Sequence, residues 1–368
     1  MYTNISIVKR VLKVYEILRN NFKLRFIPIL VGIYLLFIRL LVFIFSTLDL
    51  FFFSKLRHIK IKQPILIVGN PRSGTTFLHH YLTSNNFGTG SQLWQMLYPS
   101  VLFQKILKPI LPFLEKYSPT KYHSTDAHKT SLQSVETDDA SILFRYLDGF
   151  FLYGFLLSWD KKNLFDWVDP KKRDTSTRDF NWLESMWKRV LISNNQDRII
   201  GKLFSISANM PKFQKRFPDA KVLYMVRDPL SVIPSGLSLV TGVLDKMFGF
   251  WNLPKNKRER FINNLYNGLV ELLNRFHNDW TNQKINKEKV MIVHFDRMMN
   301  DFEGLMKDIS EFLDIDINEK LYNDIKETSE KQKTFKSKHK YDLSKFGLTE
   351  DKIKKDCKKI YETFLNEK

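Results

Sequence analysis

A short apolar run followed by a glycine-rich turn, residues 64–82 (PILIVGNPRSGTTFLHHYL), constrains the fold of this chain more than any other feature. Ile65 to Val68 is an apolar run that ends at Gly69, which is typical of a buried strand. The residues after the turn can continue as a helix, which we predict for Phe77 to Thr83. A strand, a glycine turn and a helix in this order direct backbone N–H groups and a helix N-terminus toward an anion.

The turn has the glycine spacing of a nucleotide-hydrolysing phosphate loop, but it lacks the lysine of that loop. The hydrolase loop is G-x-x-x-x-G-K-[ST], and its lysine reaches the outer phosphates. Here Gly69 and Gly74 keep the spacing, Thr75 occupies the lysine position, and Arg72 stands two residues before the second glycine. The sequence therefore predicts an anion site in which an arginine supplies the positive charge.

Strands and helices are predicted to alternate along the rest of the chain. Residues 90–195 are rich in aromatic residues, lack strand alternation and are predicted to be mostly helical. The other predicted elements are strands at Asp197 to Ser205, Lys221 to Val226 and Lys289 to Phe295, and helices at Leu230 to Leu239, Asp301 to Leu313 and Glu350 to Phe364. This order indicates an α/β, P-loop-like fold with a mostly parallel sheet covered by helices on both faces. Ligands of such sheets bind at the carboxyl ends of the strands.

Composition narrows the class of partner. The 368 residues include 58 Lys and Arg against 39 Asp and Glu, a net charge of +19, which favours an anionic partner such as nucleic acid, a membrane surface or a phosphorylated cofactor. The simpler interpretation is that many lysines only keep the protein soluble. Cys357 is the single cysteine, so the chain has no intramolecular disulfide and no cysteine-based metal site, and a reducing compartment is favoured.

Residues 26–53 form a long apolar segment that is interrupted only by Arg39 and Asp49. About 20 apolar residues suffice to cross a bilayer as a helix, but each internal charge costs roughly 2.5–3.5 kcal/mol at the membrane centre. Basic residues flank the segment on both sides, which suits anionic headgroups. We favour a half-inserted or interfacial helix over a full span; the alternative is a helical hairpin packed on the protein. We therefore expect a membrane-associating segment, 1–60, and a domain, 61–368, with a mainly helical acceptor-side insertion around 90–195.

A second candidate anion site follows the predicted strand at residues 221–226. In VRDPLSVIPS, Arg227 comes directly after that strand and Ser235 follows eight residues later. Together with PRSGTT, Pro71 to Thr76, this pair resembles the two cofactor motifs of sulfotransferases that use 3′-phosphoadenosine-5′-phosphosulfate (PAPS). The resemblance is to the broad, largely bacterial sulfotransferase family with the PRSGTT loop. It extends in matching order over roughly residues 30–365, through segments such as LWQMLYP, HKTSLQSVETDDA and HKYDLSKFGLTEDKI.

The resemblance implies roles for particular residues. Arg72 and the backbone of Ser73, Gly74, Thr75 and Thr76 are expected to hold the 5′-phosphosulfate, with Arg72 stabilising the departing phosphate. Arg227 and Ser235 are expected to hold the 3′-phosphate, because both are hydrogen-bond donors suited to a dianion. Lys202 resembles a family lysine on the strand that borders the sulfuryl group.

The general base stays open. Relatives often carry a histidine a few residues after the position of Lys202, but KLFSISA has none, and Gln95 stands at a frequently acidic position where it cannot act as a base. His128, which matches a histidine common in the family, and the acids Glu136 and Asp138 are the remaining candidates. The alternatives are a structural hydrogen-bonding role for His128 and helix capping for either acid.

The predicted function is the transfer of a sulfuryl group from PAPS to a hydroxyl acceptor, with lipids, glycolipids and carbohydrates as acceptor classes. Fixed N–H dipoles and a guanidinium can stabilise the transferred charge, so no metal is expected, and neither is a nucleic-acid partner. Because PAPS is made in the cytosol, the catalytic domain is expected on the cytosolic side of a membrane. Two alternatives remain: a P-loop kinase or NTPase, against which the missing lysine counts, and a non-catalytic membrane-bound scaffold, which the missing base motivates.

Overall fold

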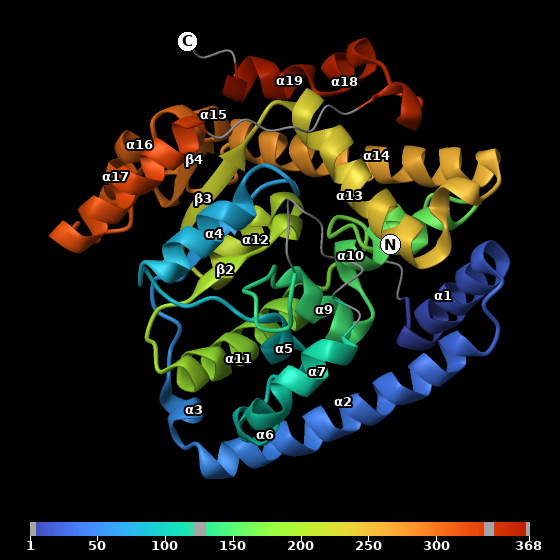
Figure 1. Cartoon of the computed structure of the whole chain (residues 1–368), viewed down its shortest axis with the longest axis horizontal. Helices are drawn as coiled ribbons and strands as arrows, with labels where there is room; N and C mark the ends of the chain where they lie inside the picture. The colour runs from blue at the N-terminus through green and yellow to red at the C-terminus, as the bar shows by residue number, and fades with distance from the viewer. Residues whose placement is uncertain (1–4, 119, 121–129, 335–341, 366–368) are drawn as a thin grey trace. The chain divides into compact units, whose positions relative to one another are not determined.

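The computed structural model describes residues 5–118, 120, 130–334 and 342–365, and its chain divides into two units. Unit 1 comprises Met1–Ile61, Thr89–Ile199 and Leu239–Gly268, and unit 2 comprises Lys62–Gly88, Ile200–Ser238 and Leu269–Lys368. Two long helices contribute to both units: α13 (Pro229–Phe248) begins in unit 2, and α14 (Lys255–Thr281) begins in unit 1. Figure 1 shows the order of the elements along the chain.

Unit 2 contains a four-stranded sheet of order β2-β1-β3-β4, in which every neighbouring pair is parallel. Its strands are β1 (Ile65–Val68), β2 (Ile200–Lys202), β3 (Lys221–Val226) and β4 (Val290–His294). Ile67 of β1 pairs with Lys202 on one side and with Leu223 of β3 on the other. Because the strands are parallel, their carboxyl ends meet at one edge of the sheet. The residues that directly follow β1, β2 and β3 are thereby brought close together.

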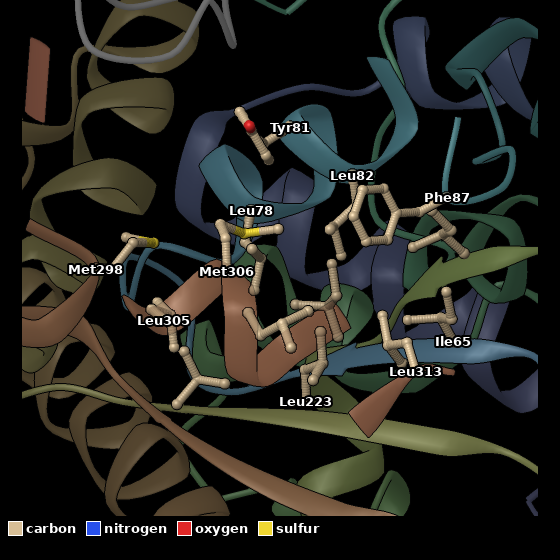
Figure 2. Packing of buried hydrophobic residues seen from close by; sticks show 14 of the residues in the cluster. Ile65, Leu78, Tyr81, Leu82, Phe87, Leu223, Met298, Leu305, Met306 and Leu313 are labelled. Carbon is tan, nitrogen blue, oxygen red and sulfur yellow. The ribbon is translucent and has the colours of Figure 1, made fainter. Parts of the chain in front are cut away.

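One face of the sheet packs against four helices of unit 2, and Figure 2 shows part of this packing. These helices are α4 (Thr75–Ser84), α15 (Phe295–Asn300), α16 (Phe302–Phe312) and α17 (Glu319–Thr334). Ile65 and Leu223 from the strands meet Leu78 of α4 and Leu305 of α16 in a buried apolar cluster. This cluster holds α4, and with it the loop that precedes α4, firmly on the sheet.

The opposite face of the sheet is covered by α14 and the C-terminal segment. Successive strand residues point to opposite faces, so Tyr224 lies on the other side from Leu223. Its ring stacks on Phe276 of α14, and Phe364 packs against both rings. The predicted parallel sheet covered on both faces is therefore confirmed. The remaining helices of unit 2 are α12 (Met210–Arg216), α18 (Glu350–Asp356) and α19 (Lys358–Ile360).

The elements of unit 1 that the structure describes are helical. They are α1 (Ile7–Phe22), α2 (Ile27–Phe52), α3 (Lys55–His58), α5 (Leu93–Leu97), α6 (Val101–Leu107), α7 (Leu111–Tyr117), α9 (Asp139–Tyr146), α10 (Gly149–Phe155) and α11 (Ser176–Asn194). The buried Trp159 packs against Phe22 of α1, Phe250, and Phe261 of α14, so rings from distant parts of the chain share one core. The apolar helix predicted at the N-terminus is α2, which is long and apolar enough to cross a membrane.

The observed boundaries correct several sequence-based predictions. The strand predicted at 197–205 is reduced to Ile200–Lys202, because the chain turns into a 3₁₀ helix at Phe204–Ala208. The helix predicted at 350–364 is divided into α18, α19 and a final π-helical turn. Helix α14 was not predicted, because its buried positions Phe261, Leu265 and Phe276 are separated by several asparagines that weaken the helical signal.

Candidate active site

The loop after β1 makes turns that require glycine at two positions. Gly69 has φ 146° and Gly74 has φ 91°. A Cβ atom at Gly69 would lie 2.8 Å from the carbonyl oxygen of Met225, and one at Gly74 would lie 2.6 Å from Cε of Met298. At Gly69 the loop passes too close to the backbone of β3 for a side chain, and at Gly74 the positive φ is a conformation that favours glycine.

Hydrogen bonds within unit 2 hold this loop in place. The backbone N–H and the hydroxyl of Ser73 both donate to the carbonyl oxygen of Asn70, at 3.2 and 2.6 Å. The side-chain amide of Asn70 donates to the carbonyl oxygen of Leu269 in α14, at 2.9 Å. Helix α4 begins directly afterwards, at Thr75. The first N–H groups of a helix have no partner within it and form its positive end, so the start of α4 suits an anion.

Three hydrogen bonds connect the predicted site residues of unit 2. Nε of Arg72 donates to Oγ of Ser235 at 3.1 Å, and Nη1 of Arg227 donates to the carbonyl oxygen of Arg72 at 2.8 Å. Nζ of Lys202, which is buried, lies 3.4 Å from Oγ1 of Thr76. The structure thus brings together residues that are separated by up to 163 positions in the sequence. They meet because β1, β2 and β3 end side by side.

An aromatic ring that was not predicted as a site residue supports Arg227. The guanidinium carbon of Arg227 lies 3.9 Å from the ring centre of Phe295, the residue that follows β4 and starts α15. A guanidinium over an aromatic face is stabilised by the ring quadrupole, so Phe295 orients Arg227. The sequence contained one indication that Phe295 lies near the site: it stands at the end of the strand predicted for residues 289–295.

Hydrogen bonds to Asp228, just before α13, also hold the turn that carries Arg227. Asp228 accepts a hydrogen bond from the hydroxyl of Tyr361 and another from the N–H of Leu230. These contacts tie the C-terminal segment to the turn that carries Arg227. The sequence offered no spacing signal for this pair, which is 133 residues apart.

His79 of α4 is a packing residue. It is fully buried, and its Nε2 lies 2.9 Å from the carbonyl oxygen of Ile200 in β2. Burial, together with the nearby positive charge of Lys202, lowers the pKa of His79 well below its usual value. A neutral imidazole that donates to this carbonyl joins α4 to β2.

The candidates for the general base lie outside unit 2 or outside the described residues. His128 is not among the residues that the structure describes. Asp138 of unit 1 is fully buried, and its Oδ1 accepts hydrogen bonds from Oγ of Ser91 at 2.7 Å and from Nε1 of Trp187 at 3.1 Å. Asp138 precedes α9, but its side chain does not cap that helix, so capping is not its role.

Two further side chains of unit 1 have defined partners. Oε1 of Glu136 accepts a hydrogen bond from Oγ of Ser134 at 3.1 Å. Gln95 completes a capping box with Gln92 at the start of α5 and donates to Asn194 at 2.9 Å. An amide suits this position because the side chain here both accepts and donates a hydrogen bond, whereas an ionised carboxylate can only accept.

The charged hydrogen-bond donors of the candidate site in unit 2 are all positive. Arg72, Lys202 and Arg227 lie at one edge of the sheet beside the N-terminus of α4. This set suits a ligand with more than one anionic group. Among the described residues, no three His, Cys, Asp or Glu side chains are grouped as a metal site would need.

Comparisons with known proteins identify the family and the fold. A sequence model of the sulfotransferase family matches residues 64–319. Sulfotransferase STF1 from Mycobacterium tuberculosis is 16% identical, with a TM-score of 0.69 over 95% of this chain and 90% of its own. Sulfotransferase STF9 from Mycobacterium avium is 15% identical, with a TM-score of 0.64 over 87% of this chain and 81% of its own. A search of curated proteins finds no match. The family model confirms the predicted family, and the structures show a shared fold.

Proposed function

The chain belongs to the sulfotransferase family, and we propose that it transfers a sulfuryl group from PAPS to a hydroxyl group of its acceptor. The observation that carries this proposal is the meeting of Arg72, Lys202 and Arg227 at the ends of three neighbouring strands. PAPS carries a phosphosulfate at the 5′ position of its ribose and a phosphate at the 3′ position. Such a nucleotide needs cationic donors at two places, and the two motifs supply them.

In this proposal, the loop and the start of α13 hold the two anionic groups of the nucleotide, which are attached to the same ribose. Arg72 and the loop from Ser73 to Thr76 bind the 5′-phosphosulfate, whereas Arg227 and Ser235 bind the 3′-phosphate. The bond between Arg72 and Ser235 uses one of the five guanidinium N–H groups. The planar fork of Arg72 therefore has further donors to offer to the phosphosulfate.

The chemical step moves one sulfuryl group and one proton. The acceptor oxygen attacks sulfur, the bond between sulfur and the bridging oxygen breaks, and 3′-phosphoadenosine-5′-phosphate (PAP) leaves. Arg72 stabilises the negative charge that develops on the departing phosphate, as expected for a loose, in-line transfer. Lys202 lies beside the sulfuryl group, and the acceptor proton passes to one of the three candidate bases, His128, Glu136 or Asp138.

The proposal is tested by following the label from [³⁵S]PAPS into an extract of the native membranes, with PAP binding measured in parallel. Label transfer that requires the protein supports a sulfotransferase with PAPS as donor. Binding of PAP without transfer to any native extract would favour the non-catalytic scaffold. Magnesium-dependent ATP hydrolysis without PAP binding would favour a P-loop NTPase.

Replacing Arg227 with alanine is expected to weaken PAP binding by roughly 10- to 150-fold, the loss of about 1.5–3 kcal/mol that a charge-assisted hydrogen bond contributes. Isothermal titration calorimetry measures the change. Arg297→Ala is the matched control, because this arginine lies in the same unit and pairs with Asp301 and Asp308 at the surface. Equal PAP affinities of the Arg227→Ala and control variants would refute the phosphate contact.

The acceptor and the location of the enzyme form part of the same proposal. The apolar helix α2 favours a membrane-associated enzyme, with residues 1–60 as the attached segment and residues 61–368 as the sulfotransferase domain facing the cytosol. Proximity to a bilayer in turn favours a lipid or glycolipid acceptor over a carbohydrate. Mass spectrometry of lipids and glycans from cells that express the protein and supply PAPS would identify the acceptor as the species that gains SO₃.

A further inference from the structure

The solvent-facing side of α2 is an apolar surface with a single polar residue. Apart from Thr47, whose hydroxyl donates to a carbonyl oxygen of its own helix, every exposed residue of α2 is aliphatic or aromatic. The most exposed of them are Leu30, Leu36, Phe43, Phe51 and Phe52. Monomeric soluble proteins rarely expose an apolar face of this length.

The other side of α2 is fixed to unit 1 by a buried carboxylate. Asp49 is completely buried and accepts hydrogen bonds from the N–H groups of Val101 and Leu102 and from the hydroxyl of Ser100. Nε of Arg189 in α11 donates to the same carboxylate at 2.9 Å. The carboxylate therefore forms an ion pair with Arg189, and it also accepts hydrogen bonds at the positive, N-terminal end of α6.

The second charge within α2 is also turned toward unit 1. Nε and Nη2 of Arg39 donate to the carbonyl oxygen of Phe144, at 3.2 and 3.1 Å. Between the two charged residues, Phe45 stacks on Phe103 of α6. Both charges that interrupt the apolar segment thus have partners in unit 1, and neither lies on the exposed face.

Helices α6 and α7 lie beside α2 (Figure 1), and a 3₁₀ helix at Lys108–Ile110 joins them. The buried side of this helical pair, including Leu107 and Leu111, packs in one cluster with Leu41 and Phe45 of α2. Four other apolar residues of this stretch are exposed: Ile106 of α6, Ile110 of the 3₁₀ helix, and Phe113 and Tyr117 of α7. We use the name insertion surface for these four residues together with the exposed apolar residues of α2.

We propose that the insertion surface enters one leaflet of a phospholipid bilayer, with α2 lying in the plane of the membrane. This inference rests on the membrane association proposed above and specifies how it occurs. It assigns unit 1 a monotopic binding surface built from two helical segments, of the kind that amphipathic interfacial helices form. The charged side of α2 stays on the protein, and the apolar side meets the acyl chains.

A transmembrane orientation of α2 conflicts with these contacts. Its 26 residues extend about 39 Å, and the hydrocarbon core of a bilayer is about 30 Å thick. Arg39 stands at the middle of the helix, so in a transmembrane orientation it would lie near the bilayer centre. Arg39 and Asp49 would then either lose their partners or draw α6 and α11 into the hydrocarbon. Both outcomes leave charges or polar helices without water, which is unfavourable.

The charges around the insertion surface favour a bilayer over a second copy of the chain. Exposed basic residues lie at both ends of α2 and along α6 and α7: Lys23, Arg25, Lys55, Arg57, Lys105, Lys108 and Lys116. In a dimer formed through this surface, like charges would meet at both ends of α2. Anionic lipid headgroups instead provide the opposite charge.

Membrane binding through the insertion surface is tested by sedimentation of the full-length protein with vesicles of phosphatidylcholine and phosphatidylglycerol. Phe43→Glu in α2 and Phe113→Glu in α7 are each expected to reduce vesicle binding at least tenfold. Tyr322→Glu is the matched control: it also places a carboxylate at an exposed aromatic residue, but in unit 2, and it is expected to bind vesicles as wild type does. Unchanged thermal unfolding of each variant shows that it folds.

The orientation is tested by the depth of single labels. In a Cys357→Ala background, a fluorophore is attached to the new thiol of Leu30→Cys, Phe37→Cys, Phe43→Cys or Leu50→Cys, and lipids with nitroxides at known depths quench it. An in-plane helix predicts similar depths for the four labels, whereas greater depth at the two central labels would overturn the in-plane inference in favour of a span. Absence of vesicle binding, with a dimer found by analytical ultracentrifugation, would overturn it in favour of a second copy. PAP affinity measured on the same samples separates failure of this inference from failure of the proposed enzymatic function.

Discussion

Replacing Arg72 with alanine is expected to lower the rate of sulfuryl transfer by about 10²- to 10³-fold, the effect of removing one preorganised donor from developing negative charge. Arg72 lies between β1 and α4, and its guanidinium donates to Ser235 while its carbonyl oxygen accepts from Arg227. The side chain is therefore oriented before the reaction begins. Single-turnover kinetics with [³⁵S]PAPS, at donor concentrations that saturate each variant, would measure the loss in the chemical step.

A lysine at the same position separates the charge from the shape of the side chain. Arg72 has φ 80°, and alanine and lysine meet the same backbone strain there, so a difference between them reports the side chain alone. Arg72→Lys is expected to retain more activity than Arg72→Ala, because it keeps the positive charge but loses the planar fork. Arg297→Ala again serves as the surface control. Wild-type turnover in the Arg72→Ala variant would be incompatible with the assigned role.

Replacing Asp148 with asparagine is expected to lower the free energy of unfolding by about 3–5 kcal/mol, because it removes the negative charge that faces the two buried arginines Arg10 and Arg173. Asp148 is almost completely buried in unit 1. Arg173 donates to both of its carboxylate oxygens, at 2.9 and 2.6 Å, and Arg178 donates to one at 2.9 Å. Arg10 of α1 lies 3.6 Å away. Urea denaturation followed by far-UV circular dichroism would measure the change.

The pH dependence of this variant provides a second check. Burial by itself raises the pKa of Asp148, but the hydrogen bond and charge of Arg173, with the charges of Arg10 and Arg178, outweigh burial and hold the pKa below its usual value. A depressed pKa contributes stability above the unfolded-state value of about 3.9, and that contribution is lost as the pH falls through the folded-state pKa. The difference between wild type and Asp148→Asn should therefore shrink when the pH is lowered below about 4.

Glu184→Gln is the matched control for Asp148→Asn. Glu184 pairs with Lys188 one turn later on α11, and both side chains are partly exposed. Such a pair contributes at most about 0.5 kcal/mol. A destabilisation by Asp148→Asn no larger than that of Glu184→Gln would show that the three arginines do not depend on the carboxylate.

The sequence alone predicted those parts of the protein that depend on local order along the chain. β1, the glycine loop and α4 follow one another within twenty residues, and β3 lies where its apolar run predicts it, at Lys221–Val226. The Arg72 and Arg227 motifs were sufficient to predict the family, which the matching sequence model confirms over residues 64–319. Local order was sufficient here because glycine conformation and apolar periodicity are properties of neighbouring residues.

Only the tertiary structure decided which distant side chains meet. Phe295 orients Arg227 because β4 pairs with β3, and no spacing along the chain predicts that contact. The sequence identified Arg39 and Asp49 as obstacles to membrane insertion, but the structure supplies their partners, the carbonyl oxygen of Phe144 and the guanidinium of Arg189. The physical reason is the same in both cases. A charge within an apolar segment is unfavourable only until packing brings a partner to it, and such partners come from residues far away in the chain.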